Sequence, residues 1–288
     1  MKISKRIGIV GNGFVGSAVR YGFSPNVGVD AEVRVYDRDP NKSTHVLRDV
    51  LDTDIIFLSV PTPSNSDGSM NIDIVDSVLN DINEYAQLFP IGIILLRSTI
   101  TPGTTRQLQE KYPSLRIVFN PEFLTERSAN FDFINQSRFI LGGDSDDMIE
   151  VSELFRERFG STLSIIETNY ETAEMIKYMT NTFFATKISF LNDMKLLADK
   201  CGVIWEDAIE GFVRDGRVGH SHLNVPGHDG KYGFGGSCFP KDIQALIDFG
   251  EKNDVDMNVL KGAWETNLKV RPEKDWEKLK GRAVVDEI

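Results

Sequence analysis

The sequence has little of what marks several specialised classes of protein. Its 288 residues include only two cysteines, Cys201 and Cys238, too few for a disulfide framework, and they lack the C-x-x-C spacing of metal sites. No stretch approaches the roughly 20 apolar residues that a helix needs to cross a bilayer. The apolar run near the N-terminus is short and broken by glycines, unlike a signal peptide. We therefore expect a cytoplasmic protein with no membrane association.

Positive charge is also in deficit. Lys and Arg total 32 against 43 Asp and Glu, a formal net charge of −11, which is the wrong sign for coating phosphate backbones and argues against a nucleic-acid partner. With 41% hydrophobic and 26% charged residues, the composition is that of a globular protein. The length suits one large domain or two ordinary ones.

The first half of the chain alternates two kinds of segment. Short β-branched runs predict strands at residues 6–10, 32–36, 54–60, 91–96, 115–119 and 138–141. Stretches between them have helical period, for example Ile72, Val75, Leu79 and Ile82. Continuous apolar strands that alternate with helices indicate a doubly wound α/β domain, with a parallel sheet covered on both faces.

From residue 169 the pattern becomes helical. Residues 169–200 contain no proline or glycine and predict one long connecting helix; shorter helices are expected at 205–213, 242–252 and 255–270, with a glycine-rich loop at 214–236. The last ten residues resemble a helix exit followed by a strand that never acquires a partner. We expect three parts: a nucleotide-binding domain at 1–168, a mainly α-helical central and dimerisation domain at 169–272, and a C-terminal remnant at 273–288.

A dinucleotide motif follows the first predicted strand. Gly11, Gly13 and Gly16 stand in the order G-N-G-F-V-G, so Phe14 and Val15 open the next helix. The first glycine permits a tight turn, the second lets the backbone approach a pyrophosphate, and the third allows close helix packing. Asp37 ends the second strand 21 positions after Gly16, where a carboxylate would bind the adenosine ribose and repel a 2′-phosphate. This spacing predicts a Rossmann-like domain and NAD, although Arg38 could accommodate the phosphate of NADP.

Two threonines follow later strands at the same predicted edge of the sheet. Thr62 lies in V-P-T-P and Thr99 in R-S-T, where ligands of such folds bind. The alternative is turn and helix-capping chemistry, which these residues by themselves favour.

Cys238 gives the sharpest chemical signal. In G-G-S-C-F-P-K-D it would stand at a helix N-terminus, where unpaired N–H groups, the helix dipole and Lys241 would favour the thiolate. A thiolate adds to an aldehyde to give a thiohemiacetal, from which hydride can leave to form a thioester. The alternative, a buried inert cysteine, suits Cys201 better. Asp242 could position or activate water, or could be only an N-terminal helix charge.

Other polar groups are ambiguous from spacing alone. Lys177 and Asn181 share a face of the long helix and could stabilise an oxyanion, but spacing favours a solvated pair with Glu174 bonded to Lys177. Glu122 and Glu126, in N-P-E-F-L-T-E, are each either a cap or a general base.

Taken in order, these motifs resemble one family. The set G-N-G-F-V-G, V-P-T-P, R-S-T, N-P-E-F-L-T-E, K-Y-M-T-N and F-G-G-S-C-F-P-K-D is similar to the UDP-glucose/GDP-mannose dehydrogenases, over nearly the whole chain. The resemblance implies that two NAD⁺ oxidise a nucleotide-sugar alcohol to the carboxylate, UDP-glucose to UDP-glucuronate, through a cysteine thioester. It implies a homodimer through the long helix and no metal.

The resemblance also implies residue roles. The catalytic set is Cys238, Lys177, Asn181, Asp242, Glu126 and Thr99. The cofactor set is Gly11, Gly13, Phe14, Val15, Gly16, Asp37, Lys42, Thr62, Thr99, Glu126 and Lys241. The substrate set is Glu122, Phe123, Leu124, Lys177, Asn181, Arg217, Phe234, Gly235 and Cys238. The match reverses the preference for the plain interpretations of Thr99 and Lys177.

The chain departs from the family in two respects. The loop at 220–232 is longer than in many members and holds three of the four histidines. The family's C-terminal domain, which grips the uridine, is expected to be lacking, so a separate chain could supply it. Two other hypotheses remain open: a two-electron β-hydroxyacid dehydrogenase, which gives Cys238 no task, and a non-catalytic module that binds NAD and nucleotide sugars.

Overall fold

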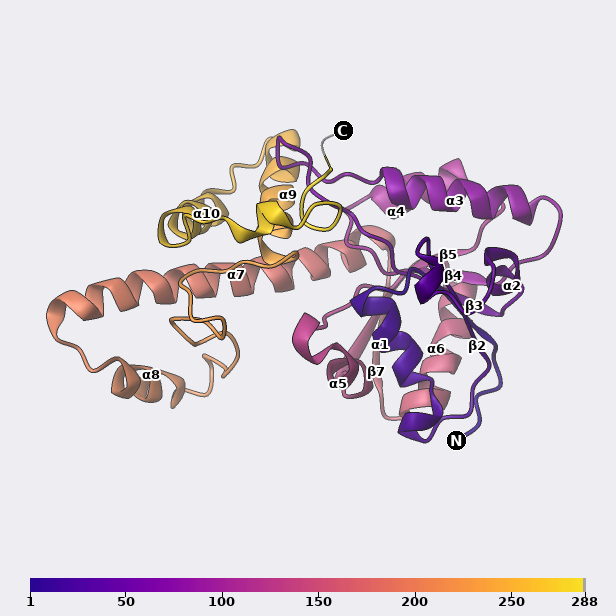
Figure 1. The fold of residues 1–288 in the computed structure, drawn as a ribbon, viewed down its shortest axis with the longest axis horizontal. Helices are drawn as coiled ribbons and strands as arrows, with labels where there is room; N and C mark the ends of the chain where they lie inside the picture. The colour runs from indigo at the N-terminus through magenta and orange to yellow at the C-terminus, as the bar shows by residue number, and fades with distance from the viewer. Residues whose placement is uncertain (287–288) are drawn as a thin grey trace. The chain divides into compact units, whose positions relative to one another are not determined.

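The computed structural model describes residues 1–286, which divide into two compact units. Unit 1 comprises Met1–Thr62 and Ile72–Lys177, and unit 2 comprises Pro63–Asn71 together with the residues from Tyr178 onward. Figure 1 traces the chain through both units. Within the described residues, no helix is long and apolar enough to span a membrane.

Unit 1 contains a sheet in the order β2-β1-β3-β4-β5-β6-β7. Its strands are β1 (Ile7–Val10), β2 (Val33–Tyr36), β3 (Ile55–Leu58), β4 (Ile93–Leu96), β5 (Ile117–Phe119), β6 (Arg138–Gly142) and β7 (Ser164–Thr168). Neighbouring strands are parallel except β5 and β6, which pair antiparallel through Phe119 and Gly142. The sheet is therefore predominantly parallel, as predicted, with one antiparallel pair. Strand β7 was not predicted, because its residues are mostly solvent-accessible.

Helices cover both faces of this sheet, as predicted. One core packs the sheet against α1 (Phe14–Gly22), α5 (Ala129–Ile134) and α6 (Ser145–Phe159). The other packs it against α2 (Leu47–Leu51), α3 (Asp73–Ala86) and α4 (Thr104–Lys111). The strands bury their side chains on both sides because each face is covered, and so their sequences are apolar runs and not alternations. Three-residue 3₁₀ turns η1 (Pro25–Val27), η2 (Pro40–Lys42) and η3 (Glu126–Ser128) complete the unit.

The long helix α7 (Tyr170–Cys201) was predicted to within one residue at each end. It starts in unit 1, where Tyr170 and Ala173 pack on the sheet, and continues into unit 2. There α9 (Phe239–Lys252) and α10 (Asn258–Val270) form a core with it, and the loop after α8 (Trp205–Val213) packs around Leu191. Figure 1 shows α7 as the longest helix.

Residues 63–71 lie in sequence between the two segments of unit 1, but they belong to unit 2. Met70 joins the α9–α10 core. Ser64 donates its backbone N–H to the carbonyl of Ala283 (2.9 Å) and accepts one from Val285 (2.9 Å), next to a parallel bridge with Val284. The segment after η4 (Asp275–Lys278) therefore does have a strand-like partner, contrary to expectation, because a distant loop supplies the pairing groups.

Candidate active site

The glycine motif forms the tight turn between β1 and α1. Gly11 has a φ of +89°, and a Cβ there would lie 2.4 Å from the carbonyl oxygen of Ser59. A Cβ on Gly16 would lie 1.9 Å from the carbonyl oxygen of Gly11, so this position also requires glycine. A Cβ on Gly13, by contrast, would have open space around it to a distance of 4 Å. The N-terminal turn of α1 thus has its bare backbone accessible to a phosphate, which fits a dinucleotide.

Asp37 ties this turn to the end of β2. Its carboxylate accepts hydrogen bonds from the backbone N–H groups of Asn12 (2.6 Å) and Asp39 (2.9 Å). The Asn12 amide donates to the carbonyl oxygen of Lys42 (2.7 Å), whose side chain is half exposed. Phe14 and Val15 pack partly buried against the adjacent core. The predicted ribose-binding carboxylate and the glycine turn are therefore neighbours.

Thr62 and Thr99 also lie together, although they follow different strands. The Thr62 hydroxyl donates to the backbone carbonyl of Thr99 (2.7 Å), and the Ser98 hydroxyl donates to that of Val60 (2.7 Å). These bonds join the loops after β3 and β4, at the carboxyl edge of the parallel strands. Their direct contact with a cofactor stays a prediction.

Lys177 is buried against the segment after β5. Its ammonium donates to the backbone carbonyl of Glu122 (2.5 Å) and lies 2.9 Å from the Glu122 carboxylate. Burial by itself would raise the pKa of Glu122, but the Lys177 charge and the backbone N–H of Leu124 hold that pKa below its usual value. The Phe123 ring is close to two cations: its centroid lies 5.4 Å from the Lys177 ammonium and 4.6 Å from the Arg138 guanidinium. Lys177 is therefore buried and paired with Glu122, unlike the solvated Glu174–Lys177 pair that helix spacing alone favoured.

Glu174 instead holds the start of α4. Its carboxylate accepts from the backbone N–H groups of Gly103 (2.6 Å) and Thr105 (2.7 Å) and from the Thr105 hydroxyl (2.6 Å). Burial raises its pKa to about 7 against these stabilising donors. Glu174, which lies on α7, therefore anchors α4, the helix that follows Thr99.

In unit 2, Cys238 is the N-cap residue of α9, with Pro240 in the first turn as predicted. The residue is partly exposed, its sulfur lies 3.8 Å from the Ser237 hydroxyl, and its carbonyl accepts from the Asp242 N–H (2.8 Å). Cys201, expected to be the buried cysteine, is exposed because it lies at the solvent end of α7. The thiol at the helix N-terminus is thus the one placed for activation.

A buried polar cluster stands one turn into α9. Asp242 is 1% exposed, and its two carboxylate oxygens accept from Lys241 (2.5 Å) and from the Asn181 amide nitrogen (2.5 Å). Because the amide nitrogen of Asn181 donates to Asp242, this contact fixes the orientation of the Asn181 amide. The positive charge of Lys241, expected to favour the thiolate, is paired with Asp242.

The other predicted residues fall in diverse settings. Glu126 opens η3 at the surface. Arg217 is exposed and bonds to Asp215 (2.8 Å). Leu124 and Phe234 are buried, and Gly235 packs beneath Arg271.

Sequence reasoning missed the buried polar residues that hold the loop before Cys238, which are Asn192, Asn267 and Arg271. Asn267 and Arg271 are one turn apart at the end of the helix predicted at 255–270, but this spacing does not indicate which distant groups they bind.

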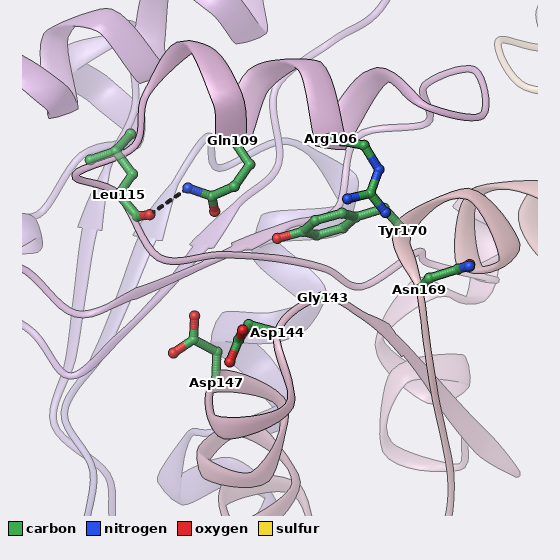
Figure 2. A pocket seen from close by; sticks show the side chains of 8 residues that line it. All are labelled: Arg106, Gln109, Leu115, Gly143, Asp144, Asp147, Asn169 and Tyr170. Atoms are coloured by element: carbon green, nitrogen blue, oxygen red, sulfur yellow. Dashed lines mark hydrogen bonds between the residues drawn. The ribbon is translucent and has the colours of Figure 1, made fainter.

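A separate pocket of about 410 Å³ lies in unit 1 (Figure 2). It is lined by Arg106, Gln109, Leu115, Gly143, Asp144, Asp147, Asn169 and Tyr170. Within the lining, the Gln109 amide donates to the backbone carbonyl of Leu115 (2.8 Å), whereas the Tyr170 hydroxyl donates to the carbonyl of Ile117 (2.7 Å) and Asp147 accepts from Arg116 (2.7 Å), both outside it. None of the lining residues is a predicted site residue. In the described residues, no group of three or more His, Cys, Asp or Glu side chains could hold a metal ion.

The glycine turn between β1 and α1, the order of the parallel strands and the position of Asp37 at the end of β2 are the features of a dinucleotide-binding Rossmann-like fold. Two family models match: the NAD binding domain of the UDP-glucose/GDP-mannose dehydrogenase family at residues 34–159 and its central domain at 171–269. The chain belongs to this family, and its cofactor is NAD.

Named relatives agree with this assignment. The UDP-glucose 6-dehydrogenase of Rickettsia prowazekii is 36% identical over 228 residues, which are 76% of this chain and 50% of that protein. UDP-glucose 6-dehydrogenase AglM of Haloferax volcanii is 30% identical, over 91% of this chain and 69% of its own. A solved UDP-glucose dehydrogenase from Pyrobaculum islandicum superposes with a TM-score of 0.78 at 27% identity, covering 92% and 68% of the two chains. The chain spans about half the length of the first curated relatives it matches.

Proposed function

We propose that the chain carries the catalytic residues for oxidation of UDP-glucose to UDP-glucuronate with two NAD⁺. The observation that carries this proposal is Cys238 at the N-cap of α9, one turn before the buried Asn181–Asp242–Lys241 cluster. A two-electron hydroxyacid dehydrogenase would leave this thiol without a task. The names of the relatives support the choice of sugar.

The proposed reaction has three stages, and atoms and electrons balance in each. The sugar C6 alcohol loses a hydride and a proton to become an aldehyde. The Cys238 thiolate adds to the aldehyde carbon, and the resulting thiohemiacetal loses a second hydride to become a thioester. Water then cleaves the C–S bond, releasing the carboxylate and the thiol. Bound NAD⁺ accepts one hydride in each oxidation.

Charged and polar groups of the chain assist these stages in the proposal. Lys177 supplies positive charge for the alkoxide and oxyanion, and Asn181, fixed by Asp242, adds a hydrogen bond. Thr99 and Glu126 are proposed to position water and move its proton. Glu122, Phe123 and Leu124 form the sugar-facing segment.

The test is the stoichiometry of NADH. The protein with UDP-glucose should release two NADH per sugar, while Cys238→Ser should release no UDP-glucuronate. Cys201→Ser is the matched control and should keep wild-type stoichiometry, since Cys201 is at the far end of α7. Release of one NADH per substrate, or an active Cys238→Ser, would refute the thioester scheme. A reducing cytoplasm is the proposed location, because the mechanism requires a reduced thiol.

We also propose that a second copy of the chain covers one face of α7. Among the described residues of α7, six large apolar side chains are between 38% and 62% exposed, and five of them are Met179, Phe183, Phe190, Met194 and Leu197. Their separations of four, seven, four and three residues place them on one stripe, the pattern of a helix-pairing seam. Phe190→Glu should convert the dimer to a monomer in light scattering. Phe131→Glu, at an exposed phenylalanine of unit 1, should leave the mass unchanged.

We further propose that a separate polypeptide supplies groups that bind the uridine moiety of the substrate. Remote binding energy of this kind contributes to turnover as well as to affinity. The KM for UDP-glucose, measured with this chain alone and with a candidate partner added, tests it; an unchanged KM and kcat would reject that partner.

A further inference from the structure

The segment before Cys238 is held by side chains and not by a neighbouring strand. Asn267 of α10 is fully buried, and its amide pairs with both backbone groups of Phe234: its oxygen accepts from the Phe234 N–H (2.7 Å) and its nitrogen donates to the Phe234 carbonyl (3.0 Å). On the other side, Asn192 of α7 accepts from the Gly233 N–H (3.0 Å). Two helices thereby fix consecutive peptide groups four and five residues before the thiol.

Arg271, one helical turn after Asn267, makes a second anchor. Its side chain is 4% exposed and donates to the Tyr232 carbonyl (3.2 Å), to Asp229 (2.6 Å) and to Asp275 (2.7 Å). This guanidinium therefore links the loop carboxylate, the loop backbone and the start of η4. Removing this guanidinium would leave the carboxylates of Asp229 and Asp275 without their positively charged partner.

The glycines of this segment are explained by these anchors. A Cβ on Gly233 would lie 2.4 Å from the Asn267 amide oxygen, and one on Gly235 would lie 2.6 Å from the Arg271 guanidinium. Gly236, with a φ of +73°, has open space around it. Gly233 and Gly235 thus make room for the anchoring side chains, and only Gly236 faces space that a ligand could enter.

We propose that Asn267 and Arg271 are positioning residues for Cys238. They hold residues 232–236 so that the thiol stays at the N-terminus of α9, where backbone N–H groups stabilise its ionised form. Neither side chain needs to touch substrate. The effect on the thiol stands by itself, while the effect on turnover rests on the proposed function.

The test measures the reactivity of Cys238 directly. In a Cys201→Ser background, the rate of alkylation by iodoacetamide is followed from pH 5 to 9 in Asn267→Asp and Arg271→Lys. Asn267→Asp keeps the acceptor but loses the donor to Phe234, and Arg271→Lys keeps the charge but loses the fork of donors. The matched control is Lys231→Ala in the same loop, whose exposed pair with Glu273 (3.0 Å) is outside the network.

Both variants should alkylate about tenfold more slowly at neutral pH, with the profile moved to higher pH, because a misplaced helix terminus stabilises the thiolate less. Turnover should fall about tenfold to a hundredfold, as expected for misplacement of a reacting group, with NAD⁺ affinity unchanged. Lys231→Ala should behave as wild type, and Arg271→Lys should react faster than Arg271→Met.

Three outcomes would overturn the proposal. The first is wild-type alkylation profiles in folded Asn267→Asp and Arg271→Lys. The second is an equal loss in Lys231→Ala. The third is unfolding of both variants, by circular dichroism, which would make the pair necessary for the fold and not for positioning. If the alkylation rates fall as expected but the wild-type chain turns over no nucleotide sugar, the positioning role stands and the proposed function fails.

Discussion

Lys177 and Glu122 form an ion pair inside unit 1, with the ammonium nitrogen 2.9 Å from the carboxylate and side-chain exposures of 3% and 6%. The lysine comes from α7 and the glutamate from the segment after β5, so the pair joins the long helix to the carboxyl edge of the sheet. In such a setting each charge depends on the other, because water cannot replace the missing partner.

Removing one partner should therefore be costly. Lys177→Met and Glu122→Gln should each lower the free energy of unfolding by about 3–5 kcal/mol, since each leaves a buried group without its counterpart. The double variant should lose much less than the sum of the two. Urea denaturation of the four proteins measures this coupling.

The matched control is the surface pair of Lys111 and Asp76, with a similar separation of 2.7 Å but side-chain exposures of 55% and 33%. Lys111→Met should cost less than about 1 kcal/mol, because solvent screens an exposed pair. Equal losses for Lys111→Met and Lys177→Met would show that the burial of the Lys177 pair contributes nothing.

This ion pair shows where the sequence was insufficient. Local spacing suggested Glu174 as the partner of Lys177, because residues three apart on a helix are neighbours. Tertiary contacts override that spacing, since Glu122 and the start of α4 offer both side chains better partners. The long helix, by contrast, could be predicted closely, because 32 residues without proline or glycine have few other options.

The glycine turn and Asp37 could likewise be predicted, because their geometry is local to consecutive elements. The antiparallel β5–β6 pairing and the partner of Val284 could not, since both depend on long-range docking that no local pattern encodes. The loop anchors Asn267 and Arg271 were missed for the same reason.

The raised pKa of Glu174 should make the stability of the protein depend on pH. This pKa is raised by burial to about 7 in the folded chain, above its ordinary value of 4.5. The unfolded chain therefore releases this proton first, and stability should fall as pH rises from about 4.5 to about 7 and change no further above that. Relative to Glu174→Gln, the wild-type chain should lose up to about 3 kcal/mol across this window in urea titrations.

The neighbouring Glu171 is the control with the opposite sign. Its hydrogen bond to Arg106 holds its pKa below the ordinary value, so any stability it contributes is lost as pH falls. Glu171→Gln should keep most of the Glu174 slope, because burial, and not the Glu171 charge, is the main cause of the raised pKa of Glu174. A Glu174→Gln profile parallel to wild type between pH 4.5 and 7 would contradict the prediction.

We expect Asp37 to determine the preference for NAD⁺ over NADP⁺. Asp37→Ser should weaken NAD⁺ binding about tenfold to a hundredfold, because a charged acceptor for the ribose hydroxyls is lost. Binding of NADP⁺ should weaken less or improve, since the carboxylate that repels a 2′-phosphate is gone. Calorimetric titration with both cofactors gives the ratio. Asp39→Asn, two residues further on, should keep the wild-type preference; an unchanged ratio in Asp37→Ser would remove Asp37 from the ribose site.

Adding one methyl group at Gly235, next to Arg271, should destabilise the protein. A Cβ there would lie 2.6 Å from both the guanidinium and the Asp275 carboxylate, so Gly235→Ala should lower the free energy of unfolding by about 1–3 kcal/mol through overpacking. Gly216→Ala, in the same unit but with open space around it, should be neutral or slightly stabilising, because alanine restricts the unfolded chain. Thermal denaturation compares the two. Because the clash displaces the Arg271 anchor, Gly235→Ala should also slow Cys238 alkylation, whereas Gly216→Ala should not; equal stability and reactivity in the two variants would mean that the loop relaxes without loss.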